Sequence, residues 1–209
     1  MYLGVDLEQF VRDPYSSGIQ RVLQYLAIEW PSDVGADFVV PVEDAPGRPA
    51  GFALLTPAQA AELLTMPFLE REPGTDLRFI VRDHLTGIDA TVVKPGDLLA
   101  LYDGWVLPEV SYLPSVLDRL EQFAACLPTA MIGYDALPMS DPANYRFKPG
   151  ATAYVSEYFR RLATADAVVC ISYYSRDAIL GRLRRDPLRP ISVASPGGDQ
   201  LEIREPLRP

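Results

Sequence analysis

The sequence predicts an α/β fold: a doubly wound, mostly parallel sheet of the Rossmann-like type with helices on both faces. Short apolar runs typical of strands alternate with amphipathic stretches of about 10 to 15 residues typical of helices. Some runs, such as Ala167 to Ile171, are apolar throughout, as expected for strands covered on both faces. With 209 residues, 48% of them hydrophobic, the chain is long enough to bury a core as a single domain.

The elements of the first half follow from the apolar pattern and from turn residues. Strands are predicted over residues 2–7, 37–42 and 51–55, and a helix over residues 19–28. A second helix is expected to begin at Pro57, with Thr56 as its N-cap. Residues 79–81 and 91–93 are expected to pair as a hairpin, although 44–93 could instead be a variable insertion.

The second half shows a more regular alternation of strands and helices. Strands are predicted over 97–102, 129–134, 167–172 and 191–194. Helices are predicted over 113–127 and 151–165, and a last helix runs through 178–183. Ser172 is the expected N-cap of the last helix.

Ligands of open parallel sheets bind outside the carboxyl ends of the strands. Strand ends and the turns that follow them carry a set of polar, aromatic and glycine residues: Ser17, Gly18, Asp103, Trp105, Tyr134, Asp135, Ser172, Gly197 and Gly198. At Gly18 a ligand could approach the backbone, where the first N–H groups of a helix favour an anion such as phosphate. We therefore expect a ligand crevice between the Gly18 and Gly197 turns.

Charge and hydropathy exclude some classes of protein. The net charge of −9 and the pI near 4.6 argue against a general nucleic-acid binder, which needs a cationic face. No apolar run reaches the roughly 18 residues of a membrane span, and no signal peptide is recognisable, so a cytoplasmic location is expected.

Histidine and cysteine are too few for several kinds of catalytic site. His84, the only histidine, lies in a predicted polar turn, and Cys126 and Cys170 lie in apolar stretches, where buried thiols are expected. These residues have no zinc-ligand spacing, and no G-x-S-x-G motif accompanies His84. Neither a metal site nor a serine hydrolase is expected.

Five motifs, in this order, resemble the group 1 (family 4) glycosyltransferases of the GT-B fold. They are Ser17-Gly18-Ile19-Gln20-Arg21-Val22, Gly96-Asp97 to Asp103-Gly104-Trp105, Tyr134-Asp135-Ala136-Leu137-Pro138, Ala165 to Ser172 with Ser175, and Pro196-Gly197-Gly198-Asp199. The resemblance implies the N-terminal, acceptor-side domain of a retaining enzyme that moves a sugar from a nucleotide-sugar to a glycan or lipid-linked acceptor. It further implies bacterial polysaccharide assembly, with no cofactor and no metal.

In this family a second domain holds the donor through a Glu-x7-Glu motif. That domain is missing from these 209 residues, so the chain alone is expected to be inactive. Glu62 and Glu70 have the same spacing, but they lie in the wrong domain, and we interpret the match as chance.

The resemblance assigns roles to the motif residues near the donor. Ser17, Gly18 and Ile19 would offer backbone N–H groups to the donor diphosphate, and Arg21 would reach a phosphate or be a solvated surface charge. Arg12 and Asp13 are expected in a loop near the same edge.

Tyr134 and Asp135 occupy the place where many relatives carry a His-Asp pair near the transferred sugar. Asp135 could orient an acceptor hydroxyl, act as general base, or cap a turn. Asp103 and Trp105 would line the acceptor site, unless Trp105 packs in the core, and Ser172 would contact the ligand in addition to capping a helix.

The region from Arg146 to Arg189 contains nine Lys and Arg residues against four Asp and Glu, in contrast to the acidic chain as a whole. These residues are either solvated helix faces or a docking surface for an anionic membrane or a lipid-diphosphate acceptor. Two other functions stay open: a non-catalytic binding or scaffold module, and a nucleotide-binding oxidoreductase domain. The second lacks the G-x-G-x-x-G motif at the first turn.

Overall fold

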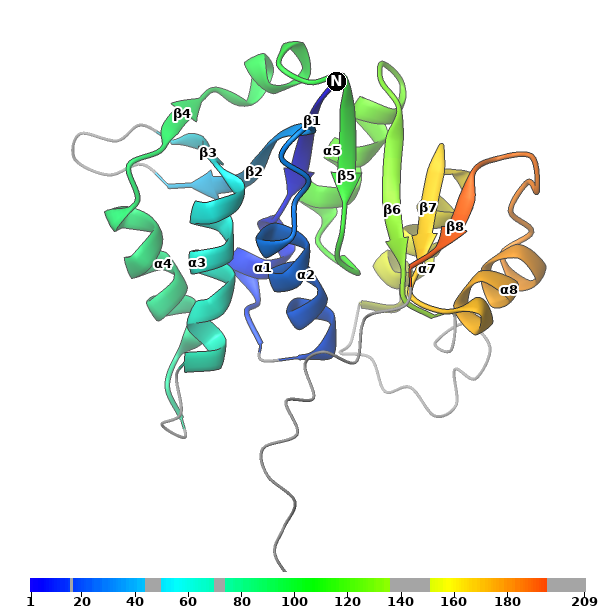
Figure 1. Ribbon diagram of the computed structural model, residues 1–209, viewed down its shortest axis with the longest axis horizontal. Coiled ribbons are helices and arrows are strands. Elements are labelled where there is room, and N and C mark those ends of the chain that lie inside the picture. The colour runs from blue at the N-terminus through cyan, green and yellow to red at the C-terminus, as the bar shows by residue number, and fades with distance from the viewer. Residues whose placement is uncertain (16, 44–49, 70–73, 136–150, 195–209) are drawn as a thin grey trace, which may run out of the picture.

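The computed structural model describes residues 1–15, 17–43, 50–69, 74–135 and 151–194, and this part of the chain forms one eight-stranded sheet. The strands are β1 (Tyr2–Asp6), β2 (Gly35–Val42), β3 (Gly51–Leu55), β4 (Thr91–Val93), β5 (Gly104–Leu107), β6 (Thr129–Gly133), β7 (Ala167–Cys170) and β8 (Ile191–Val193). Their order across the sheet is β4-β3-β2-β1-β5-β6-β7-β8 (Figure 1). Neighbouring strands in the series β2-β1-β5-β6-β7-β8 are parallel. Strand β3 runs antiparallel to both of its neighbours, β2 and β4. The predicted α/β class with a mostly parallel sheet is confirmed.

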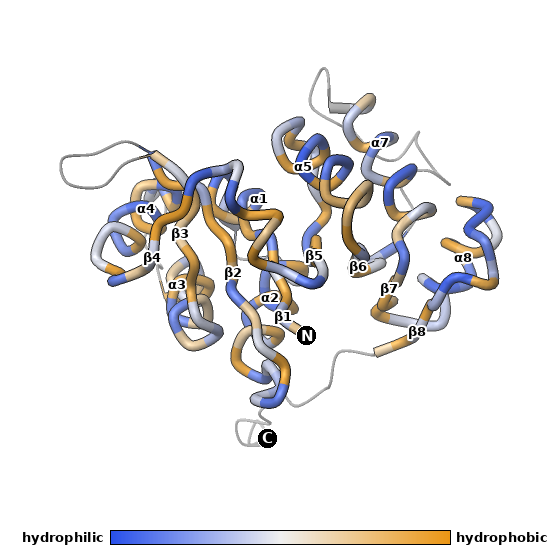
Figure 2. The backbone as a smooth tube through the Cα atoms, turned by 90° about the horizontal axis from the view of Figure 1, so that it is seen from above, coloured by the Kyte–Doolittle hydropathy of each residue, from blue (hydrophilic) through white to orange (hydrophobic). Residues whose placement is uncertain are grey.

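Helices cover both faces of this sheet. They are α1 (Glu8–Arg12), α2 (Gly18–Ile28), α3 (Pro57–Leu69), α4 (Leu77–Gly87), α5 (Pro114–Ala124), α7 (Ala151–Thr164) and α8 (Tyr173–Arg182), with the 3₁₀ helix η1 (Pro95–Ala100) before β5. Figure 2 shows α2 and α3 on one side of the sheet and α5 and α7 on the other. Because the chain moves from β1 to β2 in one direction and from β5 to β8 in the other, right-handed crossovers put the two sets of helices on opposite faces.

Two apolar clusters lie on these two faces. In the first, Phe38 of β2 packs with residues of α2 and α3 such as Leu23 and Leu63. In the second, Trp105 of β5 packs with residues of α5, α7 and α8, including Phe123. The alternation of buried side chains along β2 and β5 therefore supplies both layers of the core.

The register of β1 against β5 brings Gly4 opposite Trp105. The Trp105 ring lies where a Cβ on Gly4 would be, and it packs edge-on against Phe123 with ring centroids 4.5 Å apart. Trp105 is only 1% exposed, so it is a core residue.

Most of the other predicted elements are present within a few residues of their predicted bounds. The predicted N-caps are also confirmed: the Thr56 hydroxyl accepts a hydrogen bond from Gln59 N, and that of Ser172 from Ser175 N. Residues 51–93 contribute two strands and two helices to the same sheet and core.

The strand predicted over 97–102 is wrong, because Pro95–Ala100 form η1 and β5 begins only at Gly104. Leu98 alone of this helix is fully buried, and Leu101 is 42% exposed. The apolar run therefore belongs to a short 3₁₀ helix, from which Leu98 is buried in the core and Leu99 packs partly against it. So short an apolar run has no periodicity, and the sequence therefore does not distinguish a strand from a helical turn here.

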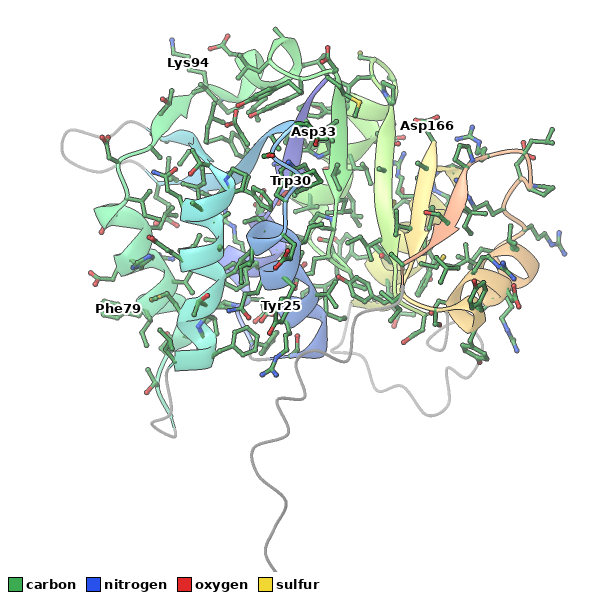
Figure 3. The ribbon with its side chains drawn as sticks, viewed as in Figure 1. Tyr25, Trp30, Asp33, Phe79, Lys94 and Asp166 are labelled. Carbon is green, nitrogen blue, oxygen red and sulfur yellow. The ribbon has the colours of Figure 1, made fainter. Side chains whose placement is uncertain are left out.

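The hairpin predicted between 79–81 and 91–93 is also wrong. Residues 79–81 belong to α4, which Asp76 caps at its amino end, and 91–93 pair with β3. Val81 and Leu85, four residues apart, face the core, whereas Phe79 lies on the outer side of α4 (Figure 3).

Three smaller expectations also need correction. His84 lies in α4 rather than in a turn, and Arg12 is the last residue of α1, a helix that was not predicted. Cys170 is buried as expected, but Cys126 is exposed because it follows the end of α5.

Candidate functional site

The carboxyl ends of the parallel strands lie along one edge of the sheet, at the bottom of Figure 1. The strand order reverses between β1 and β5 at this edge, which is where open α/β sheets bind ligands. Helices α2 and α8 both begin here. We therefore take this edge, where the sequence analysis expects a ligand, as the candidate site.

Among the residues that the structure describes, none covers the amino end of α2 at Gly18. Ser17 is the N-cap, and its hydroxyl accepts a hydrogen bond from Gln20 N at 3.2 Å. Gly18 is exposed, and a Cβ built on it would meet no atom within 4 Å, while Ile19 is half-buried. A ligand could thus approach the first turn of α2 at Gly18.

Arg21, in the same turn, is exposed and lies over a ring of the neighbouring helix. Its guanidinium carbon is 5.0 Å from the centroid of Phe68, near the end of α3. This contact gives Arg21 a structural partner, and its role toward a phosphate stays a prediction.

Tyr134, which follows β6, is buried, and its hydroxyl donates to the carbonyl oxygen of Pro108 at 2.8 Å. Burial raises the pKa of its phenol well above the usual value, so Tyr134 stays uncharged. The side chain ties the end of β6 to the residue that follows β5. A catalytic role of Tyr134 stays a prediction, and in that role its phenol would be uncharged and already hydrogen-bonded to Pro108.

Asp135 comes next and is half-buried. The pKa of Tyr158 is raised by burial and, after that, by the charge of Asp135. The two side chains are therefore close together. The carboxylate is thus at the candidate edge, and its role as base or orienting group stays a prediction.

Ser172 begins α8 at the same edge. Its hydroxyl accepts from Ser175 N at 3.0 Å and lies 2.9 Å from the Ser175 hydroxyl, which in turn donates to the backbone oxygen of Tyr134. The start of α8 is thereby joined to the end of β6. A direct ligand contact of Ser172 stays a prediction.

Asp103 and Trp105 do not lie at this edge, and their predicted placement there is wrong. Since β5 begins at Gly104, both residues are at its amino end, on the opposite edge of the sheet. The Asp103 carboxylate accepts a hydrogen bond from Tyr2 N at 2.7 Å, at the start of β1. Gly197 and Gly198 lie outside the described residues, which end at Ala194.

A cluster of buried polar side chains at the candidate edge was not predicted. Its members come from the end of β1, from α1, from α2 and from the segment after β5: Asp6, Glu8, Gln9, Gln20, Glu109 and Ser111. Their position directly after strand-like runs was the available signal. The contacts among them join residues as much as 102 positions apart, so sequence patterns could not reveal them.

Gln20 is the centre of one half of this cluster. Its side-chain oxygen accepts from Tyr15 N at 2.5 Å, and its nitrogen donates to the Asp13 backbone oxygen and to Glu109 Oε1, both at 3.2 Å. Because the amide is bonded at both ends, its orientation is fixed. Gln20 therefore ties the stretch before α2 to the segment after β5.

Glu109 is 6% exposed, and no described residue makes a hydrogen bond to its buried Oε2. Burial is the main reason that the pKa of Glu109 is raised to about 8, and the nearby charges of Asp13 and Asp6 raise it further. The hydrogen bond from Gln20 acts in the opposite direction and lowers the pKa. At neutral pH Glu109 is mostly a protonated carboxylic acid.

Arg119 of α5 holds the other half of the cluster. Its guanidinium bonds to Asp6 Oδ2 at 2.9 and 2.7 Å and to Glu8 Oε2 at 2.8 Å. Burial raises the pKa of Asp6. Burial also acts to raise the pKa of Glu8, but the charge and hydrogen bond of Arg119, together with the Ser115 hydroxyl and the charge of Arg12, lower it overall. The triad locks the carboxyl end of β1 against α5.

Several arginines of the Arg146–Arg189 region are used within the fold. Arg160 and Arg161 bond to Glu157, and the buried Arg185 donates to backbone oxygens at the end of α7, including that of Ala165 at 2.8 Å. Arg182 and Arg184 stay exposed. Among the described helices, none has the length and apolar content to cross a membrane.

Over the same described ranges, no three His, Cys, Asp or Glu side chains are grouped as a metal site requires. Comparison of the chain with protein-family models, with curated proteins and with solved structures finds no match.

Proposed function

We propose that this chain is the acceptor-side domain of a glycosyltransferase that moves a sugar from a nucleotide-sugar to a glycan or lipid-linked acceptor. The ligand would lie at the carboxyl edge of the sheet, with its diphosphate at the amino end of α2. Activity would require a donor-binding domain in addition to this one. The alternative of a non-catalytic module would use the same edge for binding alone.

The observation that carries the proposal is the open first turn of α2 at the point where the strand order reverses. Within the described part of the chain, the space beside Gly18 leaves the first N–H groups of α2 approachable, and these groups with the helix dipole favour an anion. Ser17, Gly18 and Ile19 belong to the motif that resembles family 4 glycosyltransferases. Fold and motif therefore point to the same few residues.

Catalysis in the complete enzyme would depend on positioning and on stabilising the charge of the departing nucleoside diphosphate. The N–H groups of the first turn of α2 would bind that charge. Asp135 would orient the acceptor hydroxyl or accept its proton, within hydrogen-bond reach. Retention of configuration and a place in bacterial polysaccharide assembly are part of the same proposal.

A matched pair of glycine variants tests the ligand site. Gly18→Leu fills the approach to α2, whereas Gly87→Leu adds the same side chain at the end of α4, where a Cβ also meets nothing within 4 Å. We expect saturation-transfer NMR with a panel of nucleoside diphosphates and nucleotide-sugars to show binding to the wild type and to Gly87→Leu, and about tenfold weaker binding to Gly18→Leu. Absence of binding to the folded wild type across the panel would refute the proposal.

We also propose that the domain works in the cytoplasm, in contact with the inner face of the membrane through Arg182 and Arg184. Changing both to Gln should reduce binding to vesicles that contain anionic lipid at low salt. Equal binding of the wild type and the double variant would eliminate this surface.

A further inference from the structure

Glu109 lies deeper than the residues of the proposed ligand site, yet it contacts the helix that begins there. Its Oε1 accepts a hydrogen bond from Gln20, the third residue of α2. The backbone N–H of Gln20 is bonded by the Ser17 cap, and its side chain is bonded to Tyr15 N. One residue thus connects Glu109 with both the cap and the stretch that leads to it.

We propose that Glu109 is a positioning residue: in its uncharged form it holds the stretch from Asp13 to Tyr15 in place through Gln20, and loss of its proton displaces this stretch and weakens anion binding at the amino end of α2. The part on anion binding rests on the proposed function. The part on the Asp13–Tyr15 stretch does not.

The surroundings of Glu109 explain why its charge would act on this stretch. From β1 the Asp6 carboxylate is close enough to disfavour a second negative charge, and so is Asp13 after α1. Asp6 is itself compensated by Arg119. An ionised Glu109 accepts a stronger hydrogen bond from Gln20, so the displacement comes from its repulsion of the Asp13 carboxylate, which is held by the Tyr112 hydroxyl.

Among the described residues, the other titratable groups that face Glu109 are the phenols of Tyr15, Tyr134 and Tyr158, whose pKa values its charge raises. The pKa of Tyr15 is about 12, chiefly through its hydrogen bond to Asp13, and burial places the pKa of the other two far above the usual value. None of these phenols titrates between pH 6 and 9. Within this group, Glu109 is the one that changes charge in that range, with its pKa of about 8.

Glu109→Gln keeps an acceptor oxygen for Gln20 and cannot ionise, which makes it the matched uncharged form. We expect the Tyr15 amide to exchange with deuterium at similar rates in the two proteins at pH 6.5. At pH 9 it should exchange about fivefold or more faster in the wild type, where Glu109 is mostly ionised. The affinity for inorganic pyrophosphate should fall over the same pH range in the wild type but not in Glu109→Gln.

A second variant and a direct titration complete the test. Asp13→Asn removes the facing charge and should shrink the pH effect on the Tyr15 amide. Carboxyl ¹³C NMR of the wild type should show one buried glutamate titrating near pH 8. A Glu109 that titrates near 4.5, or equal pH profiles for wild type and Glu109→Gln, would overturn the inference. If pyrophosphate binds to no variant while the Tyr15 amide behaves as expected, the proposed anion site fails and the role of Glu109 in positioning stands.

Discussion

Arg119 donates two hydrogen bonds to the Asp6 carboxylate, at 2.9 and 2.7 Å, and so joins the carboxyl end of β1 to the middle of α5. Replacing Arg119 by Met would leave Asp6 and Glu8 buried without their cation. We expect a loss of about 3–5 kcal/mol in the free energy of unfolding, measured with urea. Arg78→Met removes an exposed ion pair with Asp76 and should cost far less stability, because solvent screens the attraction between the two charges. Similar losses in the two variants would contradict the structural role of the triad.

Glu109 predicts a pH dependence of stability with a defined sign. The unfolded chain loses this proton near pH 4.5 and the folded chain near pH 8. Between these values the folded state binds more protons, so the stability of the wild type relative to Glu109→Gln should fall as pH rises. The slope should be up to about 1.4 kcal/mol per pH unit and should level off above pH 8. Urea titrations of both proteins between pH 5 and 9 measure it, and a constant difference would exclude a buried neutral Glu109.

Arg184 has a backbone φ of 52°, in the left-handed region, two residues after the end of α8. Glycine adopts this conformation at lower cost than arginine. Arg184→Gly should therefore raise the free energy of unfolding by about 0.5–1 kcal/mol. Arg182→Gly, within the last turn of α8, should lower it by about the same amount. Thermal unfolding of both proteins gives the two signs, and a lower melting temperature for Arg184→Gly would be the contrary result.

The fit of Trp105 against Gly4 predicts that even a methyl group is not tolerated there. Gly4→Ala should destabilise the fold by about 1–3 kcal/mol, because the added Cβ overlaps the indole ring. Gly96→Ala, where a Cβ meets nothing within 4 Å, should stay within about 0.5 kcal/mol of the wild type. The two free energies of unfolding in urea compare the sites, and equal values would contradict the packing of Trp105 on β1.

The two cysteines should differ in reactivity. Cys126 is exposed, whereas burial raises the pKa of Cys170 to about 11. A thiol reagent at pH 8 should therefore modify one cysteine quickly in the native protein and both in urea. Fast modification of two thiols without denaturant would show that β7 is less protected than the structure indicates.

The sequence predicted the architecture well because most of its strands and helices have a clear period. The strand predicted around Leu98 was wrong because a run of four apolar residues fits a strand as well as a helical turn. Residues 79–81 are β-branched and aromatic, but Asp76 and the spacing of Val81 and Leu85 make them helical. Around Leu98 tertiary burial decided between two locally acceptable structures, whereas at residues 79–81 the cap and the helical spacing of the buried residues decided.

The candidate site was predicted only in part, for a different physical reason. The amino ends of α2 and α8 could be found because caps and glycines are local signals. The contact of Gln20 with Glu109 spans 89 positions, and only the neighbouring ends of β1 and β5 bring these residues together. A polar residue after a strand indicates the edge but not its partner.

The separation of the core into two layers has a consequence for synthesis on the ribosome. The cluster under α2 and α3 consists of residues up to position 88 with only a few later contributions, whereas its counterpart depends mainly on residues from 98 onward. A nascent chain that ends after β4 could thus bury the first cluster on one face of its strands. The opposite face of these strands and the unpaired side of β1 would stay exposed until β5 and α5 are synthesised. Translation would pass through an intermediate with half its sheet exposed, the stage at which this polypeptide would most need a chaperone.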